Sequence, residues 1–330
     1  MRITYWFRKK IPGGHSIEKI FETIRQQVGL SHSVQQEILP YSSNSIYRIL
    51  KNQLFTLCRS TSGIHHITGD AHYIALAMVS SKVLLTIHDC VILKTTPKNS
   101  IKHQVFLWLW YKLPIWRAKA VTTISEKSKA EIVAYTKCSP DKIQVVTNFV
   151  TPSFTVTPKI FNANQPRILH VGSTPHKNLE RLIWALSGIP CTLEIIGHLK
   201  PHEHQLLLQR GIAFENRRDV SSEEMVSRFQ AADIVAFVST YEGFGMPIIE
   251  AQATGRPVLT SNLSPMDWVA GAEGACLVDP YDVGDIKAGL LKIIQEEAYR
   301  NALIKHGLEN TKRFSLDSIT QQYLNVYASI

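Results

Sequence analysis

Two glutamates, Glu242 and Glu250, flank a glycine-containing turn that leads from an apolar run into a predicted helix. Gly243 and Gly245 let the backbone turn tightly and come close to a ligand, and Pro247 suits the first position of a helix. The N–H groups at a helix start attract anions such as a pyrophosphate, and a carboxylate can accept two hydrogen bonds from a vicinal diol. The stretch therefore indicates a site for a phosphorylated sugar. On the glycine pattern alone, a plain turn with a solvated glutamate fits equally well.

Polar residues also follow two apolar runs in the N-terminal half. His88 and Asp89 come directly after one run, and Asp70 and His72 come after the run before it. Ligands of open α/β sheets bind at the carboxyl ends of strands, so we expect these side chains to face a cleft. Asp89, Asp70 and His72 are candidates for contacts with an acceptor substrate. A purely structural role is the alternative, because a lone histidine at a strand end is usually structural.

The elements that must position these residues alternate between strands and helices. In the N-terminal half, the pattern predicts strands at 2–7, 64–68, 83–87, 121–124 and 143–146. In the C-terminal half it predicts strands at 167–171, 192–197, 212–215, 233–238, 257–260 and 275–278. Helices are expected between the latter, near 178–188, 200–210, 222–231, 247–254 and 282–296. Such alternation is typical of parallel sheets covered on both faces.

A linker divides the chain into two parts. Residues 151–166 contain three prolines and several turn-forming residues. Because 330 residues are enough for two domains, we expect a two-lobed α/β protein. The predicted parts are an N-terminal lobe, a linker, a C-terminal lobe and a final amphipathic helix, at 1–152, 153–166, 167–312 and 313–330.

Charge is distributed unevenly along the chain. The whole sequence has 36 Lys and Arg against 27 Asp and Glu, a net charge of +9. Residues 1–150 hold 20 basic and 8 acidic residues, a net +12, whereas residues 151–330 carry a net −3. A basic half attracts anionic partners such as a phosphorylated ligand, nucleic acid or an anionic membrane surface. A basic surface without a specific partner is the alternative.

The stretch 103–119 adds a second reason to consider a membrane. It mixes aromatic and basic side chains: Phe106, Trp108, Trp110, Tyr111, Trp116, Lys112, Arg117 and Lys119. An amphipathic helix of this composition is a candidate for lying in a membrane interface. The alternative is a helix packed on its own sheet with its basic residues at the rim.

Other patterns exclude several classes of protein. The five cysteines are odd in number and widely spaced, which argues against a disulfide framework and fits a reducing compartment. The first residues do not form a signal peptide, and the longest apolar run, 105–111, is far too short to span a bilayer. We therefore expect a cytoplasmic protein. Two loose groups of histidines lack the spacing of a structural metal site: His65, His66 and His72, and His198, His202 and His204.

The segment E-G-F-G-x-P-x-x-E at 242–250, continued by A-x-A-x-G-x-P-V at 251–258, is similar to a known motif. It resembles the glutamate-x7-glutamate motif of family 4 retaining glycosyltransferases, which have the GT-B fold. The similarity covers most of 165–330. In the N-terminal half it is thinner and rests on the Gly13–Gly14 loop, T-I-H-D at 86–89 and V-T-T-I-S at 121–125. The resemblance implies two Rossmann-like lobes that face each other across a cleft, with the C-terminal helix crossing back to the first.

The same resemblance assigns roles to matching positions. Glu250 would bind the ribose hydroxyls of the nucleotide, and Glu242 would contact the transferred sugar. Lys177 would bind the diphosphate, and His88 would contact the donor sugar and phosphate region. The implied catalytic residues are His88, Lys177 and Glu242. The implied donor contacts are Gly13, Gly14, Gly172, Ser173, Gly197, Phe244, Gly245, Met246, Pro247 and Glu250.

One position departs from the family pattern. The family usually has an arginine directly after the glycine of V-G, and this chain has Ser173 after Gly172. His176 is a candidate for the second positive charge at the diphosphate. The sequence does not decide what replaces the arginine.

The resemblance also implies an activity. A retaining hexosyltransferase would move a hexose from GDP-mannose or a UDP-hexose to a saccharide acceptor, lipid-linked, in cell-surface polysaccharide or lipopolysaccharide synthesis. No metal cofactor and no nucleic-acid partner are expected, and the enzyme would lie on the inner face of the cell membrane. The alternatives are a GT-B nucleotide-sugar epimerase and a non-catalytic protein that binds sugar nucleotides or nucleic acid. A dehydrogenase is excluded because no dinucleotide-binding fingerprint is present.

Overall fold

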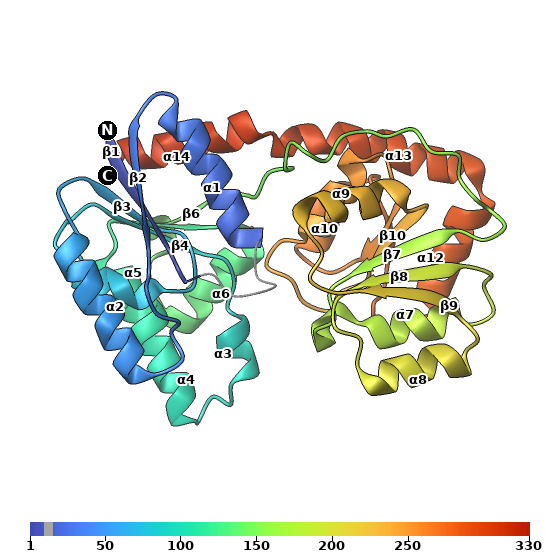
Figure 1. Cartoon of the computed structure of the whole chain (residues 1–330), viewed down its shortest axis with the longest axis horizontal. Helices are drawn as coiled ribbons and strands as arrows, with labels where there is room; N and C mark the ends of the chain where they lie inside the picture. The colour runs from blue at the N-terminus through green and yellow to red at the C-terminus, as the bar shows by residue number, and fades with distance from the viewer. Residues whose placement is uncertain (10–15) are drawn as a thin grey trace. The chain divides into compact units, whose positions relative to one another are not determined.

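The computed structural model describes residues 1–9 and 16–330, and these form two compact units. The first unit comprises residues 1–149 and 316–330, and the second comprises residues 150–315. Each unit has its own sheet (Figure 1), and each has its own hydrophobic core. The C-terminal helix therefore counts with the first unit, whereas the proline-containing stretch after residue 150 counts with the second.

The first unit is built on a parallel sheet with the strand order β2-β1-β3-β4-β5-β6. Its strands are β1 (Arg2–Phe7), β2 (Ser33–Ile38), β3 (Ile64–Ile67), β4 (Val83–Ile87), β5 (Ala120–Thr123) and β6 (Ile143–Val145). The central strands β3, β4 and β5 are buried along their whole length, as expected for a sheet covered on both faces. The edge strand β2 has no counterpart among the predicted strands, because its sequence SVQQEI is mostly polar and exposed.

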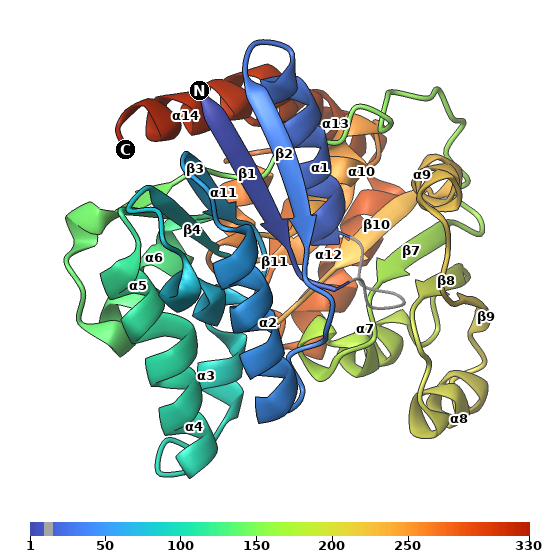
Figure 2. The ribbon, with the colours of Figure 1, turned by 60° about the vertical axis from the view of Figure 1, so that its left-hand side comes forward.

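Helices and short helical turns cover this sheet. They are α1 (Ser16–Gly29), α2 (Ile46–Arg59), η1 (His72–Ala77), α3 (Val91–Thr95), α4 (Ile101–Phe106), the π-helical η2 (Leu107–Lys112), α5 (Leu113–Arg117), α6 (Glu126–Thr136), η3 (Pro140–Lys142) and α14 (Leu316–Ala328). α6 begins after Ser125, whose Oγ accepts a hydrogen bond from Ser128 N at 3.1 Å. α14 packs beside α1 (Figure 2), and the Tyr327 hydroxyl donates to the Tyr5 hydroxyl at 2.9 Å.

The stretch 103–119 is helical as far as residue 117, with a π-helical turn in its middle. α4, η2 and α5 follow one another without a break, because the residues at their joins keep right-handed helical φ and ψ. Trp110 and Tyr111 are buried, whereas Trp108 and Trp116 are exposed. Part of the stretch thus packs on its own unit and part faces solvent. Among the residues that the structure describes, no helix is long and apolar enough to cross a membrane.

The second unit repeats the architecture, with the parallel order β12-β11-β10-β7-β8-β9. Its strands are β7 (Arg167–Val171), β8 (Thr192–Ile196), β9 (Ala213–Arg217), β10 (Ile234–Phe237), β11 (Val258–Ser261) and β12 (Cys276–Val278). Its helical segments are η4 (Pro175–Lys177), α7 (Leu179–Leu186), α8 (Pro201–Gln209), α9 (Ser222–Ala231), α10 (Met246–Ala253), α11 (Met266–Ala270), α12 (Val283–Gln295), α13 (Glu297–Thr311) and η5 (Lys312–Phe314). Every predicted strand of this half is present, within a few residues.

Strand order locates the place where each sheet can hold a ligand. In the second unit the chain passes from β7 to β8 and β9 on one side, and then returns to place β10 on the other side of β7. In the first unit β2 and β3 lie on opposite sides of β1 in the same way. Ligands of open α/β sheets bind at such reversals, beyond the carboxyl ends of the strands. The loops after β7 and β10 therefore lie where this fold can hold a ligand.

Candidate active site

A lysine from one of these loops meets a glutamate from the other. Lys177 ends η4, in the loop after β7, and Glu242 lies in the loop after β10. Lys177 Nζ donates to Glu242 Oε1 at 2.7 Å, and both side chains are partly exposed. The structure thus brings together two of the three predicted catalytic residues, although 65 positions separate them in the sequence. The pair offers one positive and one negative group at the same sheet edge.

Gly172 and Phe237 lie close to the Lys177 side chain and restrict its position. Gly172 has a φ of +100°, and a Cβ at this position would lie 2.9 Å from both Cγ and Cε of Lys177. Lys177 Nζ also lies 4.7 Å from the centroid of the Phe237 ring, a favourable position for a cation. Only glycine leaves room for the lysine stem here. Gly172 therefore acts on the predicted diphosphate contact through Lys177.

Helix α10 begins at Met246, shortly after Glu242 in the sequence. Gly245 is the residue before the helix and has a φ of +111°, which favours glycine. Phe244 is buried and packs edge-on against Phe314, so the turn is anchored in the core of its own unit. Met246 and Glu250, one helical turn apart, are both partly exposed. The helix thus presents its N-terminal N–H groups and the Glu250 carboxylate while burying its apolar side.

Ser173 joins the loop after β7 to the loop after β8. Its Oγ accepts a hydrogen bond from His198 N at 2.9 Å. Gly197 has a φ of +145°, and a Cβ there would lie 2.9 Å from Ser173 Oγ. Gly172 N donates to Ile196 O at 2.8 Å, which ties the same two loops together. Ser173 is neutral, so at this position it joins two loops and brings no positive charge.

Asn178 is a residue of this site that the sequence reasoning missed. It follows Lys177 directly, has a φ of +64° and is buried. Its Nδ2 donates to Val238 O at 2.9 Å and to Pro280 O at 2.7 Å. The loop that carries Lys177 is thereby fixed to the ends of two other strands. The available signal was the residue type, because asparagine tolerates the left-handed conformation better than most residues.

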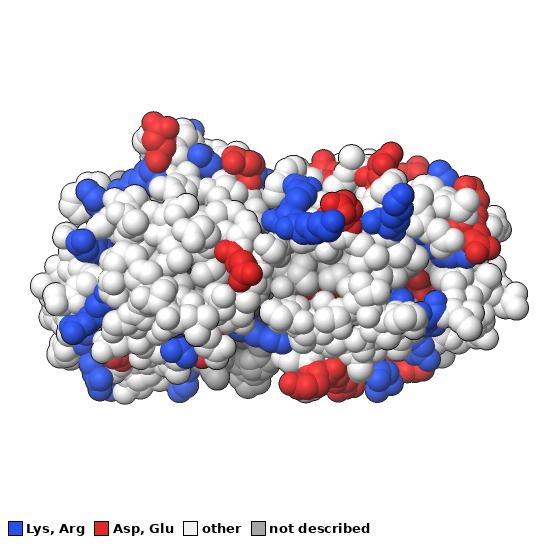
Figure 3. Space-filling model, turned by 90° about the horizontal axis from the view of Figure 1, so that it is seen from above, with Lys and Arg blue, Asp and Glu red and all other residues white. Residues whose placement is uncertain are grey.

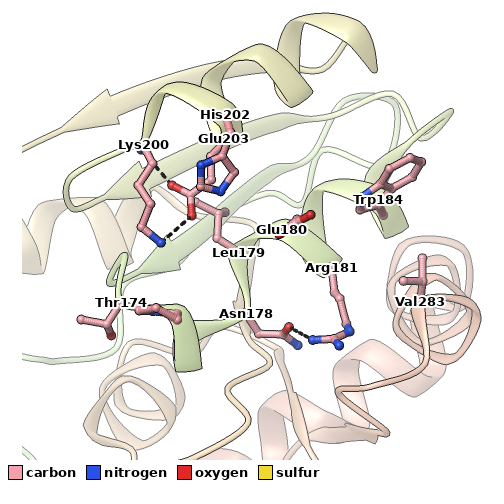
Figure 4. A pocket seen from close by; sticks show the side chains of 11 residues that line it. Thr174, Asn178, Leu179, Glu180, Arg181, Trp184, Lys200, His202, Glu203 and Val283 are labelled. Carbon is pink, nitrogen blue, oxygen red and sulfur yellow. Dashed lines mark hydrogen bonds and ion pairs between the residues drawn. The ribbon is translucent and has the colours of Figure 1, made fainter. Parts of the chain in front are cut away.

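Asn178 also lines a pocket of the second unit. It is lined by Thr174, Pro175, Asn178, Leu179, Glu180, Arg181, Trp184, Lys200, His202, Glu203 and Val283 (Figure 4). Within it, Arg181 donates to Asn178 Oδ1 at 2.9 Å, and Lys200 lies 3.5 Å from Glu203 Oε1. None of the predicted catalytic residues lines this pocket.

In the first unit, His88 is held inside the protein. Its Nε2–H donates to Thr68 O at 2.8 Å, and its ring packs edge-on against Phe21. Burial lowers the pKa of His88 below the ordinary value, so the ring is neutral at pH 7 and keeps Nδ1 as an acceptor. The adjacent Asp89 is partly exposed, and its Oδ1 accepts from Val91 N at 2.9 Å. This places a neutral imidazole and a carboxylate just beyond the end of β4.

Asp70 and His72 differ in exposure. Asp70 is exposed, and its Oδ2 lies 3.3 Å from an Nη of Arg8, a residue that follows β1 and that the sequence reasoning did not single out. His72 is buried, bonds to Trp110 O at 2.7 Å, and has a pKa that burial lowers to about 4. Burial and the bond to a main-chain carbonyl favour a structural role for His72 over contact with an acceptor. Arg8 also pairs with Glu18, so charged groups surround the end of β1.

Two further predictions concern the glycine loop and the histidine groups. The glycines Gly13 and Gly14 lie outside the described residues. The histidine group at 65–72 is divided: His66 is buried between Tyr327 and Thr86, and His65 bonds to Trp6 and to Thr61 O. Over residues 1–9 and 16–330, no group of three or more His, Cys, Asp or Glu is arranged to hold a metal ion.

Comparison with known proteins finds relatives of this chain. Residues 156–310 match the family of glycosyl transferases group 1. The O-antigen chain mannosyltransferase B of Escherichia coli is 28% identical over 308 residues, which cover 85% of this chain and 78% of that protein. An MMP alpha-(1->4)-mannosyltransferase of Mycolicibacterium hassiacum is 26% identical over 222 residues, 62% of this chain and 53% of the relative.

The fold has close counterparts among solved structures. The crystal structure of Anabaena HepE in complex with UDP and glucose covers all of both chains with a TM-score of 0.81 at 18% identity. At that identity the similarity establishes the fold. The chain therefore has the GT-B fold, and its residues 156–310 form a glycosyl transferases group 1 domain.

Proposed function

We propose that the protein is a retaining hexosyltransferase that uses a nucleoside-diphosphate sugar and extends a lipid-linked saccharide. The observation that carries the proposal is the Lys177–Glu242 ion pair, 2.7 Å long, in the loops at the sheet reversal. A cation at this place can stabilise a diphosphate as it leaves, and the adjacent carboxylate can accept hydrogen bonds from sugar hydroxyls. Under this proposal Glu250, which is partly exposed on α10, holds the ribose hydroxyls in the same way.

The proposed reaction breaks the bond between the anomeric carbon and the diphosphate oxygen. The acceptor hydroxyl oxygen forms the new bond on the same face of the sugar, and the leaving phosphate takes its proton. Lys177 and the N–H groups at the start of α10 would stabilise the negative charge that develops on the diphosphate. Because these groups supply the positive charge, the proposal includes no metal ion.

For the donor, the relatives suggest an order of testing. Two of them are named as mannosyltransferases, which makes GDP-mannose the first candidate. HepE was solved with UDP and glucose, so UDP-hexoses come next. For the acceptor, one relative is named for the O-antigen chain, which supports a growing saccharide as the substrate class. The lipid carrier and a place on the inner face of the cell membrane are part of the proposal.

Calorimetric titration with a panel of GDP-, UDP-, ADP- and dTDP-sugars tests the donor site. We expect one nucleotide to bind the wild type and to raise its melting temperature by mass action. Glu250→Ala should weaken that binding on the order of 100-fold, because two hydrogen bonds to a charged group are lost. Equal binding by Glu250→Ala and wild type would show that Glu250 on α10 does not contribute to the donor site.

Incubation with the selected donor separates the transferase from its rivals. With a saccharide acceptor, the product should keep the anomeric configuration of the donor, which nuclear magnetic resonance reads directly. Conversion of the donor sugar without any acceptor would indicate an epimerase instead. Binding of donor without turnover on any acceptor would favour a sugar-nucleotide binding protein. Activity that disappears with EDTA and returns with a divalent cation would contradict the metal-free mechanism.

A further inference from the structure

Two consecutive residues of the π-helical turn η2 bond to the loops that follow β3 and β4. Trp110 and Tyr111 are both buried. The Trp110 indole Nε1–H donates to Asp70 O at 2.7 Å, and the Tyr111 hydroxyl donates to Asp89 O at 3.1 Å. These bonds join residues that are 40 and 22 positions apart in the sequence. Each of the two side chains thus binds the main chain of a residue that the sequence predicts as an acceptor contact.

His72 makes a return contact with the same tryptophan. Its Nδ1–H donates to Trp110 O at 2.7 Å, and Asp70, which accepts from the indole, lies two positions earlier in the sequence. Burial lowers the pKa of His72 to about 4, so the ring is neutral at pH 7 and has one N–H, which this bond uses. The His72 ring also packs edge-on against the Tyr111 ring, with centroids 5.6 Å apart. The chain after β3 is therefore joined to η2 at two points.

The position of η2 is set by its own hydrogen bonding and by its packing. Leu113 N donates to Trp108 O, five residues earlier, which is the bond that defines a π-helix. The centroid of the Trp110 ring lies 4.8 Å from those of Tyr73 and Phe106. Single π-helical turns are rare in proteins and often occur at functional sites. η2 thus offers a packed support from which two aromatic side chains reach the loops.

The loop after β4 is bonded at two successive main-chain carbonyl groups. Ser128 Oγ donates to His88 O at 3.1 Å, and Tyr111 donates to Asp89 O. The Asp89 carboxylate accepts from Val91 N through Oδ1 at 2.9 Å, and it forms no ion pair with any residue in 1–9 or 16–330. On the face shown in Figure 3, by contrast, several acidic side chains lie beside Lys or Arg. Asp89 therefore keeps an oxygen that can accept a hydrogen bond from a hydroxyl group.

Asp70 supplies a second carboxylate at the neighbouring strand end. β3 and β4 are adjacent parallel strands, so the loops after them lie at the same edge of the sheet. The Asp70 side chain is 68% exposed, and its Oδ2 lies 3.3 Å from an Nη of Arg8. Because η2 binds the main chain of both loops, the two carboxylates are held at defined places on this edge. Such a pair can accept hydrogen bonds from several hydroxyl groups, which a saccharide offers.

We infer that Trp110 and Tyr111 are positioning residues of the acceptor site. They hold the main chain of the two loops, so that the carboxylates of Asp70 and Asp89 stay where hydroxyl groups of a saccharide acceptor bind. The inference rests on the proposed function, because it concerns the acceptor of that reaction. It adds two residues that touch no substrate and act through the loops that they hold. It also gives His72 a role, which is to bind η2.

Tyr111→Phe is the mildest test, because it removes one hydroxyl group and keeps the ring. The acceptor probe is the octyl glycoside that wild type uses best, from a panel of mannose, glucose, galactose and N-acetylglucosamine glycosides. The KM for this acceptor should rise on the order of fivefold, the effect of one lost neutral hydrogen bond. kcat should change less, because the carboxylates hold the acceptor in the ground state and the transition state alike. The Kd of the donor and the slow hydrolysis of donor without acceptor should stay at wild-type values.

Tyr73→Phe is the matched control. Tyr73 is another buried tyrosine of the first unit, and its hydroxyl accepts from Asn52 Nδ2 on α2 at 2.8 Å. The variant keeps the ring that packs on Trp110 and removes a buried hydroxyl, so its melting temperature should fall about as much as that of Tyr111→Phe. Its KM for the acceptor should equal that of wild type. A purely structural role of Tyr111 predicts the same KM in both variants, and that result would overturn the inference.

Trp110→Phe tests the other loop. It removes the N–H that binds Asp70 O, so hydrogen exchange should become faster at residues 70–74, whereas Tyr111→Phe should make it faster at residues 89–94. The double variant Trp110→Phe/Tyr111→Phe should raise the acceptor KM on the order of 25-fold, because separate sites contribute additively in free energy. Unchanged acceptor KM in both single variants would overturn the inference and leave the reaction standing. Failure of wild type to transfer sugar to any glycoside would instead refute the proposed function, and with it the acceptor role of both loops.

Discussion

The two units share a six-stranded parallel sheet, but they place different chemistry at the ends of their strands. In the second unit, the loops after β7 and β10 present a lysine and a glutamate that are partly exposed and joined at 2.7 Å. In the first unit, His66, His72 and His88 are buried, and each is bonded to an oxygen of the same unit. The same fold thus supports a partly exposed ion pair at the strand ends of the second unit and a cluster of buried, neutral histidines in the first.

This difference suggests a division of work. A leaving diphosphate needs positive charge and backbone N–H groups, which the second unit offers through Lys177 and α10. The first unit offers a neutral imidazole, His88, together with the exposed carboxylate of Asp70 beside Arg8. These groups suit recognition of hydroxyls more than stabilisation of a charged leaving group. Variants at these positions test whether the two units differ in this way.

The largest effect is expected from Lys177→Met. Loss of the charge that the proposed mechanism places at the diphosphate should lower kcat/KM by about 10²–10³-fold, the range for removal of one preorganised stabilising group. Lys287→Met on α12 is a matched control, because Lys287 Nζ also makes a 2.7 Å bond, to Ser187 O, away from the predicted site. Steady-state rates with the donor selected by titration measure both variants. Equal losses in the two would mean that Lys177 has only a structural role.

Gly172→Ala should act through the same lysine and have the next largest effect. The new Cβ would lie 2.9 Å from Lys177 Cγ, so the lysine stem must move and kcat/KM should fall on the order of 10-fold to 100-fold. Gly211→Ala separates displacement from backbone strain, because Gly211 also has a positive φ, +63°, but has no atom within 4 Å of the added Cβ. It should lose stability, on the order of 1 kcal/mol, and retain activity. A Gly172→Ala variant with wild-type rates would show that the position of Lys177 is not critical.

Sequence patterns predicted the second unit better than the first. Most strands of the second unit are short, mainly apolar runs between turn residues: β7, β8, β10, β11 and β12. Because most of their residues are buried, their sequences are mainly apolar and are easy to identify as strands. β2 lacks this apolar pattern because an edge strand can remain polar. α2 was missed because its leucines face outward and its fully buried residues, Asn52 and Thr56, are polar. Only Ile49 and Phe55 pack partly against the core, so the apolar pattern of a surface helix is weak.

Motif spacing located the glutamates of the candidate site, but it did not reveal their contacts. Glu242 and Glu250 were identifiable because they stand close together in one turn and helix. The pairing of Lys177 with Glu242 depends on the neighbouring positions of β7 and β10, which local sequence does not encode. The anchoring of the lysine loop by Asn178 also depends on distant carbonyl groups, those of Val238 and Pro280. Residue types therefore identified the candidate residues, whereas their partners depend on the tertiary structure.

Acid should destabilise the first unit more than the second. Burial lowers the pKa of His66 to about 3 and that of His72 to about 4, and in the second unit it lowers the pKa of His170 to about 4. Each is depressed below the unfolded value of about 6.5, so the unfolded chain binds more protons as the pH falls from 6.5 toward the folded pKa. Stability is therefore full above about pH 6.5 and is lost below it, by about 1.4 kcal/mol per pH unit for each histidine.

Hydrogen exchange at pH 7 and pH 5, corrected for the intrinsic rates, measures this loss in each sheet. The amides of β3 and β4 should lose more protection than those of β7 and β8, because two of these three histidines belong to the first unit. An equal loss in both sheets would indicate that the histidine cluster does not distinguish the two units. Greater loss in β7 and β8 would reverse the contrast.

The smallest effect is expected from Ser173→Ala. This change removes the acceptor for His198 N, while Gly172 N still donates to Ile196 O and Gly197 N to Arg217 O. Because two backbone bonds keep the loops in place, we expect a rise of only a few fold in the KM for donor, equivalent to about 1 kcal/mol or less, with kcat unchanged. Ser139→Ala in the first unit, which removes a comparable serine acceptor for Asp141 N, should leave both constants unchanged. A lower kcat for Ser173→Ala would mean that the serine hydroxyl faces the reacting diphosphate, and the positive charge at this edge would then be only part of the stabilisation.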